Sequence, residues 1–112
     1  MPRFLTGYAR SLWRELAPQL KKRGLLTPLD RAAFVALCTT YERIRQCDEI
    51  LGREGVILGN KKHPAFAIQA RAIDDFRHLA REFGLTPASR AVLDLPEPSD
   101  NRLNGLLDDL LN

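Results

Sequence analysis

"TPLDRAAFVALCTTYERIRQCDEIL", residues 27–51, is the stretch that decides the fold of this 112-residue chain. Thr27 is a residue type that caps helices, Pro28 fits a first helical position, and Asp30 follows where an acid favours the helix dipole. Apolar side chains then recur at the spacing of one helical face, which Phe34 and Cys38 widen: Ala33, Leu37, Tyr41, Ile44 and Leu51. These signals predict a helix over residues 28–53, about 39 Å long.

A second long helix is predicted after a break. The break, "GREGVILGNKKHP" at residues 52–64, contains three glycines and a proline. Its apolar run "VIL" could form a strand, but three residues are too few to predict one. Apolar residues then return in steps of three and four until Gly84 ends the pattern. They are Ala65, Ile68, Ala72, Phe76, Leu79 and Phe83. Two long helices joined by one loop predict an antiparallel helical hairpin.

Shorter helices are predicted on both sides of the hairpin. Residues 1–8 show no clear period and are expected to be loose, whereas residues 9–16 place apolar side chains on one helical face. Pro18 predicts either a kink or a second short helix that starts near Ala17 and ends before Gly24. At the other end, Thr86 and Pro87 repeat the start signal of the first long helix and predict a short helix to about Leu95.

The pattern as a whole predicts an all-α chain with three segments. A basic N-terminal segment with short helices covers residues 1–27, and the hairpin core with a capping helix covers residues 28–95. A linker and an acidic, leucine-rich C-terminal helix cover residues 96–112. Three apolar residues lie off the main helical faces, namely Phe34, Phe66 and Ile73. We expect part of this apolar surface to be buried between subunits, so that the hairpin serves as an oligomerisation unit.

The charge of the chain is spread unevenly. Residues 1–31 carry seven Lys/Arg and two Asp/Glu, whereas residues 91–112 carry one and five. A basic head with an acidic tail suggests two different partners, one of them nucleic acid. The candidate phosphate contacts are Arg3, Arg10, Arg14, Lys21, Lys22, Arg23 and Arg31, with Lys61 and Lys62 at the hairpin tip. The alternative is that these cations form solvated surface. No aromatic residues alternate with them, which argues against stacking on single strands.

Other classes of function find little support. Cys38 and Cys47 point to opposite faces of one helix and cannot bridge each other, so reduced thiols in a cytoplasmic protein are expected. No apolar run has the length of a membrane span, and no secretory signal is recognised. His63 is expected to be a cap or loop residue and His78 to be exposed. The Asp pairs at 74–75 and 108–109 are expected to be surface charge. No catalytic set, metal site or cofactor motif is predicted.

The ordered sequence signals resemble those of a known family. "GLLTPLDRAAFVALCTTYERIRQCDEILGREG", followed by "HPAFAIQARAIDDFRHLAREFGLTPASR", is similar to the small terminase subunit of tailed bacteriophages. The resemblance extends from about Trp13 to Leu93. Its most specific feature is a box after the paired helices, formed by Gly84, Leu85, Thr86, Pro87 and Arg90.

The resemblance implies a non-enzymatic subunit without a cofactor that assembles into a homo-oligomeric ring in the host bacterial cytoplasm. Such a ring binds double-stranded viral DNA at the packaging-initiation site and presents it to the large terminase subunit, which carries the ATPase and the nuclease. For the box, we favour a structural role at a helix corner over DNA contact. The tail presents the apolar face of a helix that contacts either the large subunit or its own hairpin: Leu103, Leu106, Leu107, Leu110 and Leu111.

Two rival functions remain open from the sequence. The short helices at residues 9–24, followed by Thr27 and Pro28, are compatible with a small helix-turn-helix regulator. A compact DNA-binding protein of this kind does not, however, need two helices of 20 or more residues. The other rival is a structural scaffold subunit without DNA affinity.

Overall fold

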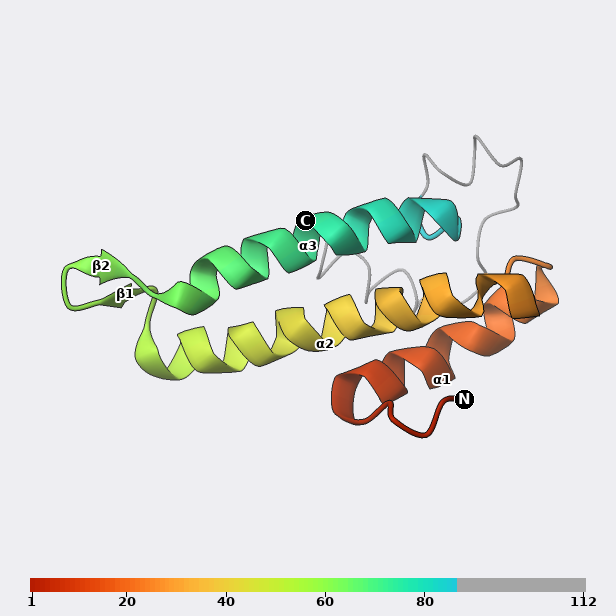
Figure 1. The fold of residues 1–112 in the computed structure, drawn as a ribbon, viewed down its shortest axis with the longest axis horizontal. Coiled ribbons are helices and arrows are strands. Elements are labelled where there is room, and N and C mark those ends of the chain that lie inside the picture. The colour runs from red at the N-terminus through yellow and green to blue at the C-terminus, as the bar shows by residue number, and fades with distance from the viewer. Residues whose placement is uncertain (87–112) are drawn as a thin grey trace.

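The computed structural model describes residues 1–86, and they form a helical protein with one very short β-ribbon (Figure 1). In chain order the elements are α1 (Gly7–Lys22), the 3-10 turn η1 (Pro28–Asp30), α2 (Arg31–Glu54), β1 (Ile57–Leu58), β2 (Lys61–Lys62) and α3 (Pro64–Glu82). The described part of the chain is therefore mostly helical, as predicted, with the short ribbon as an addition. The predicted helix to Leu95, the linker and the C-terminal helix lie outside the described residues.

The start of α2 follows from the signals read in the sequence. The backbone N–H of Thr27 donates to the Asp30 carboxylate at 3.0 Å, and the Thr27 hydroxyl donates to the same oxygen at 2.8 Å. This reciprocal capping box holds η1, with Pro28 at its first position, and α2 continues from Arg31. The same hydrogen bonds, from the Thr27 backbone first and its side chain second, lower the pKa of the Asp30 carboxyl.

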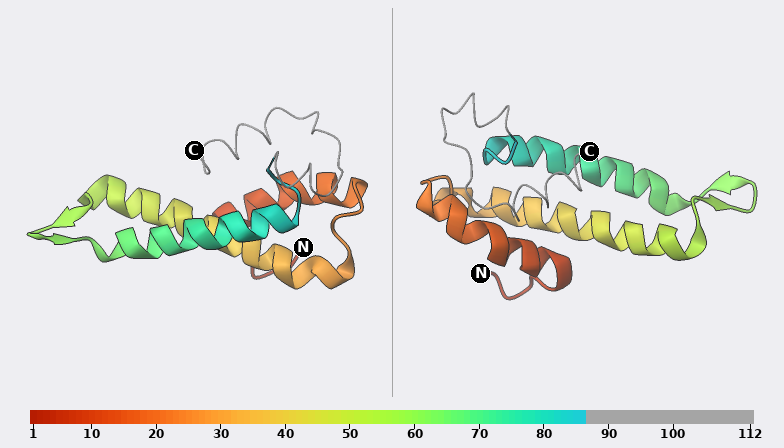
Figure 2. Two further views of the ribbon diagram at one scale, coloured as in Figure 1. Left: turned by 90° about the horizontal axis from the view of Figure 1, so that it is seen from above. Right: turned by 180° about the vertical axis from the view of Figure 1, so that it is seen from behind.

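Helices α2 and α3 lie side by side and run in opposite directions, as Figures 1 and 2 show. The residues of α3 that are buried are Ala65, Ala72, Phe76 and Ala80. The prediction that Ile68 belongs to this face is wrong, because its side chain is 52% exposed. Gln69 faces α2 at this level instead, where its side-chain amide donates to the Ile44 carbonyl at 3.4 Å and to the Asp48 carboxylate.

Helix α1 packs against the first half of α2 and the end of α3. Aromatic rings join the three helices here: the Trp13 and Phe34 centroids are 4.5 Å apart, and those of Phe34 and Phe83 are 5.6 Å apart. Phe34 is fully buried within the chain, so it is not part of the apolar surface left for another subunit. Ile73 is partly buried against the same core, whereas Phe66 remains 40% exposed.

The N-terminal region is more ordered than its sequence indicated. Helix α1 starts at Gly7 and continues across Pro18, so a second short helix does not form. Pro18 cannot bond to the carbonyl of Arg14, but both residues are exposed and water can solvate that carbonyl. Residues 1–8 are not uniformly loose either. Leu5 is buried in the core, and its N–H donates to the Pro2 carbonyl at 3.3 Å.

Two glycine–leucine corners end α1 and α3 in the same way. Gly24 has φ +72° and Gly84 has φ +68°, a conformation that glycine adopts without steric cost. The next residue then turns back onto its helix: the N–H of Leu25 donates to the Leu20 carbonyl at 2.9 Å, and that of Leu85 to the Ala80 carbonyl at 3.0 Å. Both corners line one small hollow, so they pack next to each other.

The link between α2 and α3 is a tight ribbon that His63 closes. Ile57 pairs with Lys62 and Leu58 with Lys61, so the short apolar run does form a strand. The Nδ1 atom of His63 accepts a hydrogen bond from the Ala65 N–H at 3.0 Å, which confirms the expected cap. Its Nε2 lies 3.1 Å from the Glu54 carboxylate at the end of α2.

Candidate nucleic-acid interface

One side of α1 carries a row of exposed cations. Arg10, Arg14 and Lys21 are separated by four and seven residues, so the helical period places them on one side, next to the buried face. We call this row the α1 basic stripe. It extends over about 16 Å at 1.5 Å per residue. B-DNA presents one phosphate about every 3.4 Å of axis on each strand, so the stripe has the length of about five phosphates.

The stripe ends at a concave surface that we call the head groove. The groove has a volume of about 230 Å³ and is lined by Met1, Trp13, Lys21, Leu26, Thr27, Pro28 and Arg31. Its apolar part is formed by Trp13, Leu26 and Pro28, while Lys21 and Arg31 contribute positive charge from two different helices. The groove therefore suits a ligand that is both apolar and acidic, and its cations continue the stripe.

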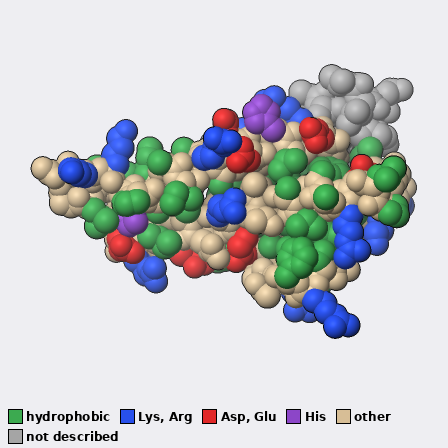
Figure 3. Space-filling model, in the orientation of Figure 1, with side chains coloured by type: hydrophobic (Ala, Val, Ile, Leu, Met, Phe, Trp, Pro, Cys, Tyr) green, Lys and Arg blue, Asp and Glu red, His purple; other side chains and the backbone are tan. Residues whose placement is uncertain are grey.

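The cations of the basic head are not neutralised by the rest of the described chain. Within residues 1–86, these six side chains make no ion pair: Arg3, Arg10, Arg14, Lys21, Lys22 and Arg31. Along the helix pair, Arg45 lies 3.6 Å from Asp48 and Arg71 lies 3.1 Å from Asp75. Figure 3 shows the contrast on one face: Lys and Arg project from the α1 end, whereas basic and acidic side chains are interspersed along α2 and α3.

The N-terminus of α1 is held on α2 by a carboxylate from the other helix. The backbone N–H of Ala9 donates to the Glu42 carboxylate at 2.7 Å, so an acid of α2 satisfies one of the free donors of α1. Gly7 has φ +57°, and a Cβ at this position would lie 2.8 Å from a Glu42 oxygen. The backbone conformation therefore favours glycine, and a side chain at this position would displace the Glu42 carboxylate that holds the start of α1.

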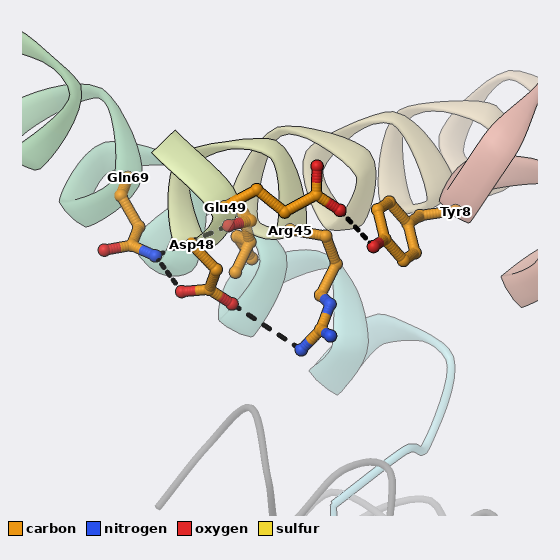
Figure 4. Close-up of polar contacts among 6 residues, drawn as sticks. Tyr8, Arg45, Asp48, Glu49 and Gln69 are labelled. Atoms are coloured by element: carbon orange, nitrogen blue, oxygen red, sulfur yellow. Dashed lines mark hydrogen bonds and ion pairs between the residues drawn. The ribbon is translucent and has the colours of Figure 1, made fainter. Parts of the chain in front are cut away.

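A polar network across the three helices adds to this attachment (Figure 4). The Tyr8 hydroxyl donates to Glu49, and the Arg45 guanidinium lies 5.3 Å from the centre of the Tyr8 ring. Asp48 joins Arg45 to Gln69 of α3. The hydrogen bond with Glu49, followed by desolvation, raises the pKa of the Tyr8 hydroxyl. The network ties the first turn of α1 to the middle of α2 and α3.

Sequence reasoning missed these attachment residues for a clear reason. Glu42 is 33 residues from Ala9 and Glu49 is 41 residues from Tyr8, so no local pattern connects them. The basic stripe is different, because its spacing of four and seven residues within one helix was present in the sequence as a signal.

The structure divides the predicted DNA-binding residues into a group at the α1 end of the molecule and a pair on β2. The first group contains the stripe, Arg31 and three further cations. Lys22 and Arg23 lie at the end of α1 and Arg3 precedes it; Arg23 is half-buried and already engaged in another contact. Lys61 and Lys62 lie on β2, at the opposite end of α2, whose 24 residues span about 36 Å. Lys62 is positioned over the Phe66 ring at 5.8 Å. One compact site therefore does not include both groups.

The remaining residues singled out in the sequence are those of the box, the tail leucines and the two cysteines. Gly84 and Leu85 are buried in the corner beside α1, and Thr86 is partly buried there. Pro87, Arg90 and the five tail residues lie outside the described residues: Leu103, Leu106, Leu107, Leu110 and Leu111. Cys38 and Cys47 are free thiols in buried positions, and burial raises the pKa of Cys38 to about 12.

Residues 1–86 also lack some types of site. No group of three or more His, Cys, Asp or Glu side chains is arranged to hold a metal ion in this range. None of the helices described is long and apolar enough to cross a membrane. His78 is exposed on α3, as predicted.

A comparison with known proteins identifies the family of this chain. A family model described as "Phage terminase, small subunit" matches residues 9–100, a range that includes the stripe, the helix pair and the box. No match was found among curated proteins or among solved structures. Proteins of this family are non-enzymatic and act in phage DNA packaging, whereas the ATPase and nuclease activities belong to the large subunit. The chain belongs to the phage terminase small subunit family.

Proposed function

We propose that this chain binds double-stranded viral DNA at the packaging-initiation site and delivers it to the large terminase subunit. The observation that carries the proposal is the α1 basic stripe, whose exposed cations make no ion pair within residues 1–86. A cation already paired with a carboxylate releases fewer counterions from DNA, so unpaired cations contribute more to binding. The family membership supports the same role.

In the proposed mechanism the subunit positions DNA and makes or breaks no bond. The stripe contacts phosphates spaced along one DNA strand, and Arg31 extends the positive surface across the head groove. Glu42, Gly7 and the Tyr8 network hold α1 on the helix pair, so that the stripe keeps one orientation. Contacts with phosphates carry no sequence information by themselves, so recognition of the initiation site needs base contacts or DNA shape in addition.

The ring is the second part of the proposal. Exposed apolar side chains at the far end of α2 and α3 support burial against another copy: Val56, Ile57, Leu58, Phe66 and Ile68. Apolar surface gathered in this way is typical of protein interfaces. A ring in the host cytoplasm would place several basic stripes around one DNA duplex and multiply weak contacts.

Salt-dependent DNA binding tests the role of the stripe. The variant Arg10→Gln/Arg14→Gln/Lys21→Gln should lose affinity, and the slope of log K against log salt should fall by about 0.9 for each phosphate contact removed. The matched control is Arg43→Gln/Arg71→Gln/Arg81→Gln, which removes the same charge from exposed positions of the helix pair. Equal losses in both variants would show that net charge alone matters. Absence of DNA binding by the native chain at low salt would favour the scaffold function.

Two further measurements separate the other parts of the proposal. Light scattering should give the mass of a closed oligomer; a monomer at working concentration would favour the helix-turn-helix regulator. The tail prediction is tested with the large subunit: Leu106→Ser/Leu107→Ser/Leu110→Ser should weaken its recruitment while the oligomer mass stays unchanged. Undiminished recruitment would contradict the proposed contact by the tail.

A further inference from the structure

The head groove has a composition that DNA phosphates alone do not explain. Phosphates need cations, but Trp13, Leu26 and Pro28 give the groove an apolar surface between Lys21 and Arg31. Burial of apolar side chains is favourable for a peptide that inserts them, while cations at the rim suit carboxylates beside those side chains. The fitting ligand is therefore an acidic peptide with apolar anchors.

The chain itself contains such a segment. Residues 103–112, "LNGLLDDLLN", place Asp108 and Asp109 between leucines, and residues 91–112 carry five acidic residues against one basic residue. The basic head, residues 1–31, has the opposite balance of two acidic and seven basic residues. The two ends of the chain are therefore complementary in charge as well as in apolar content.

The path of the described chain brings the tail within reach of the groove. The described residues end at Thr86, directly after the Gly84–Leu85 corner. That corner lines the same hollow as Leu25, and the next residue along, Leu26, lines the head groove. The 16 residues between Thr86 and Leu103 span up to about 55 Å when extended, far more than this short separation requires.

We propose that the acidic, leucine-rich tail binds in the head groove of its own chain and competes with DNA for Lys21 and Arg31. The leucines contact Trp13 and Leu26, and Asp108 and Asp109 pair with the two cations. The tail thus holds DNA affinity down until a competing ligand, either DNA or a partner that binds the tail, releases the groove. The competition with DNA rests on the proposed function; the contact between tail and groove does not.

The chain has a built-in probe of this contact. Trp13 is the only tryptophan in the sequence and lines the groove, so its fluorescence reports occupancy. In the full-length variant Asp108→Asn/Asp109→Asn, acrylamide should quench Trp13 more strongly than in the native chain. Adding a synthetic peptide of residues 99–112 should restore protection in that variant. The further substitutions Lys21→Gln/Arg31→Gln should abolish the effect of the peptide, whereas Arg43→Gln/Arg81→Gln should leave it unchanged.

DNA binding gives the second arm of the test. Asp108→Asn/Asp109→Asn should raise DNA affinity at low salt by about three- to tenfold, as expected for the loss of two competing contacts. The control Asp74→Asn/Glu82→Gln makes the same change in charge on α3 and should change affinity less. Unchanged quenching with no response to the peptide would overturn the proposal, as would equal peptide binding after loss of Lys21 and Arg31. If no variant binds DNA, the proposed function fails, while the Trp13 measurements still decide whether the tail occupies the groove.

Discussion

The basic head and the α2–α3 pair use their charges in opposite ways. In the helix pair, carboxylates and cations of one helix neutralise each other, as with Arg45 and Asp48 or Arg71 and Asp75. In the head, Asp30 is used to cap η1, and the cations of the stripe make no ion pair with the described residues. The carboxylates of Asp30 and Glu42 are used in capping contacts with backbone N–H groups, and the unpaired cations mark the surface proposed to bind DNA.

The two regions also differ in how they are held. The pair is joined by apolar contacts and by the Gln69 hydrogen bonds, whereas α1 buries one apolar face in the same core and is fixed at its N-terminus by one remote carboxylate and a polar network. The comparison therefore predicts that substitutions at these few attachments change the position of the stripe while the helix pair is retained.

Phe34→Ala should cause the largest loss, because this fully buried ring contacts both Trp13 and Phe83. Truncation of a buried Phe to Ala costs about 3–5 kcal/mol of unfolding free energy. Chemical denaturation followed by circular dichroism measures this loss. Phe66→Ala is the control, since its ring is 40% exposed and should cost much less. Similar losses in the two variants would contradict the central position of Phe34.

Gly7→Ala should cost about 1–2 kcal/mol, because an L-residue is strained at φ +57°. Gly24→Ala is a matched control, since Gly24 also has positive φ but a methyl group added there would meet no atom within 4 Å. Gly7→Ala should exceed the control because the new methyl group displaces Glu42 from Ala9. Equal losses in thermal denaturation would show that the Glu42 contact adds nothing.

Glu42→Gln should lower stability by about 0.3–1 kcal/mol, the usual size of a charge at a helix N-terminus. The amide oxygen can still accept a hydrogen bond from Ala9, so the charge and the exposed hydrogen bond from Gln46 are lost. Hydrogen exchange of the first turn of α1 should accelerate, while that of the centre of α3 should stay unchanged. Acceleration in both places would mean that α1 and the pair open as one unit.

Acid should weaken the start of α2 through Asp30, and this is the smallest effect expected. The pKa of Asp30 is lowered in the folded state by its hydrogen bonds from Thr27. Its contribution is therefore present above the unfolded pKa of about 3.9 and is lost as pH falls through the lower folded value. Denaturation curves at pH 6 and pH 3 should show a larger acid-induced loss for the native chain than for Asp30→Asn. Identical losses would contradict this assignment.

Much of the helical structure could be predicted because its signals are local. Thr27, Pro28 and Asp30 start α2 with contacts over three residues, and Gly24 and Gly84 end α1 and α3 because of their own backbone conformation. His63 as a cap is of the same kind. Ile68 and Phe34 show where local patterns failed. Helical spacing alone does not distinguish a side chain that faces a neighbouring helix from one just beside that contact.

The sequence by itself determined approximately where the two long helices begin and end, the separation of a basic head from an acidic tail, and the presence of enough cations for a DNA-binding surface. These properties depend on residue type and on short-range contacts. Only the tertiary structure decided which cations make no ion pair among the described residues, how the two glycine–leucine corners meet, and that Glu42 holds α1. These properties depend on residues 33 or more positions apart, whose proximity is created by packing of the core.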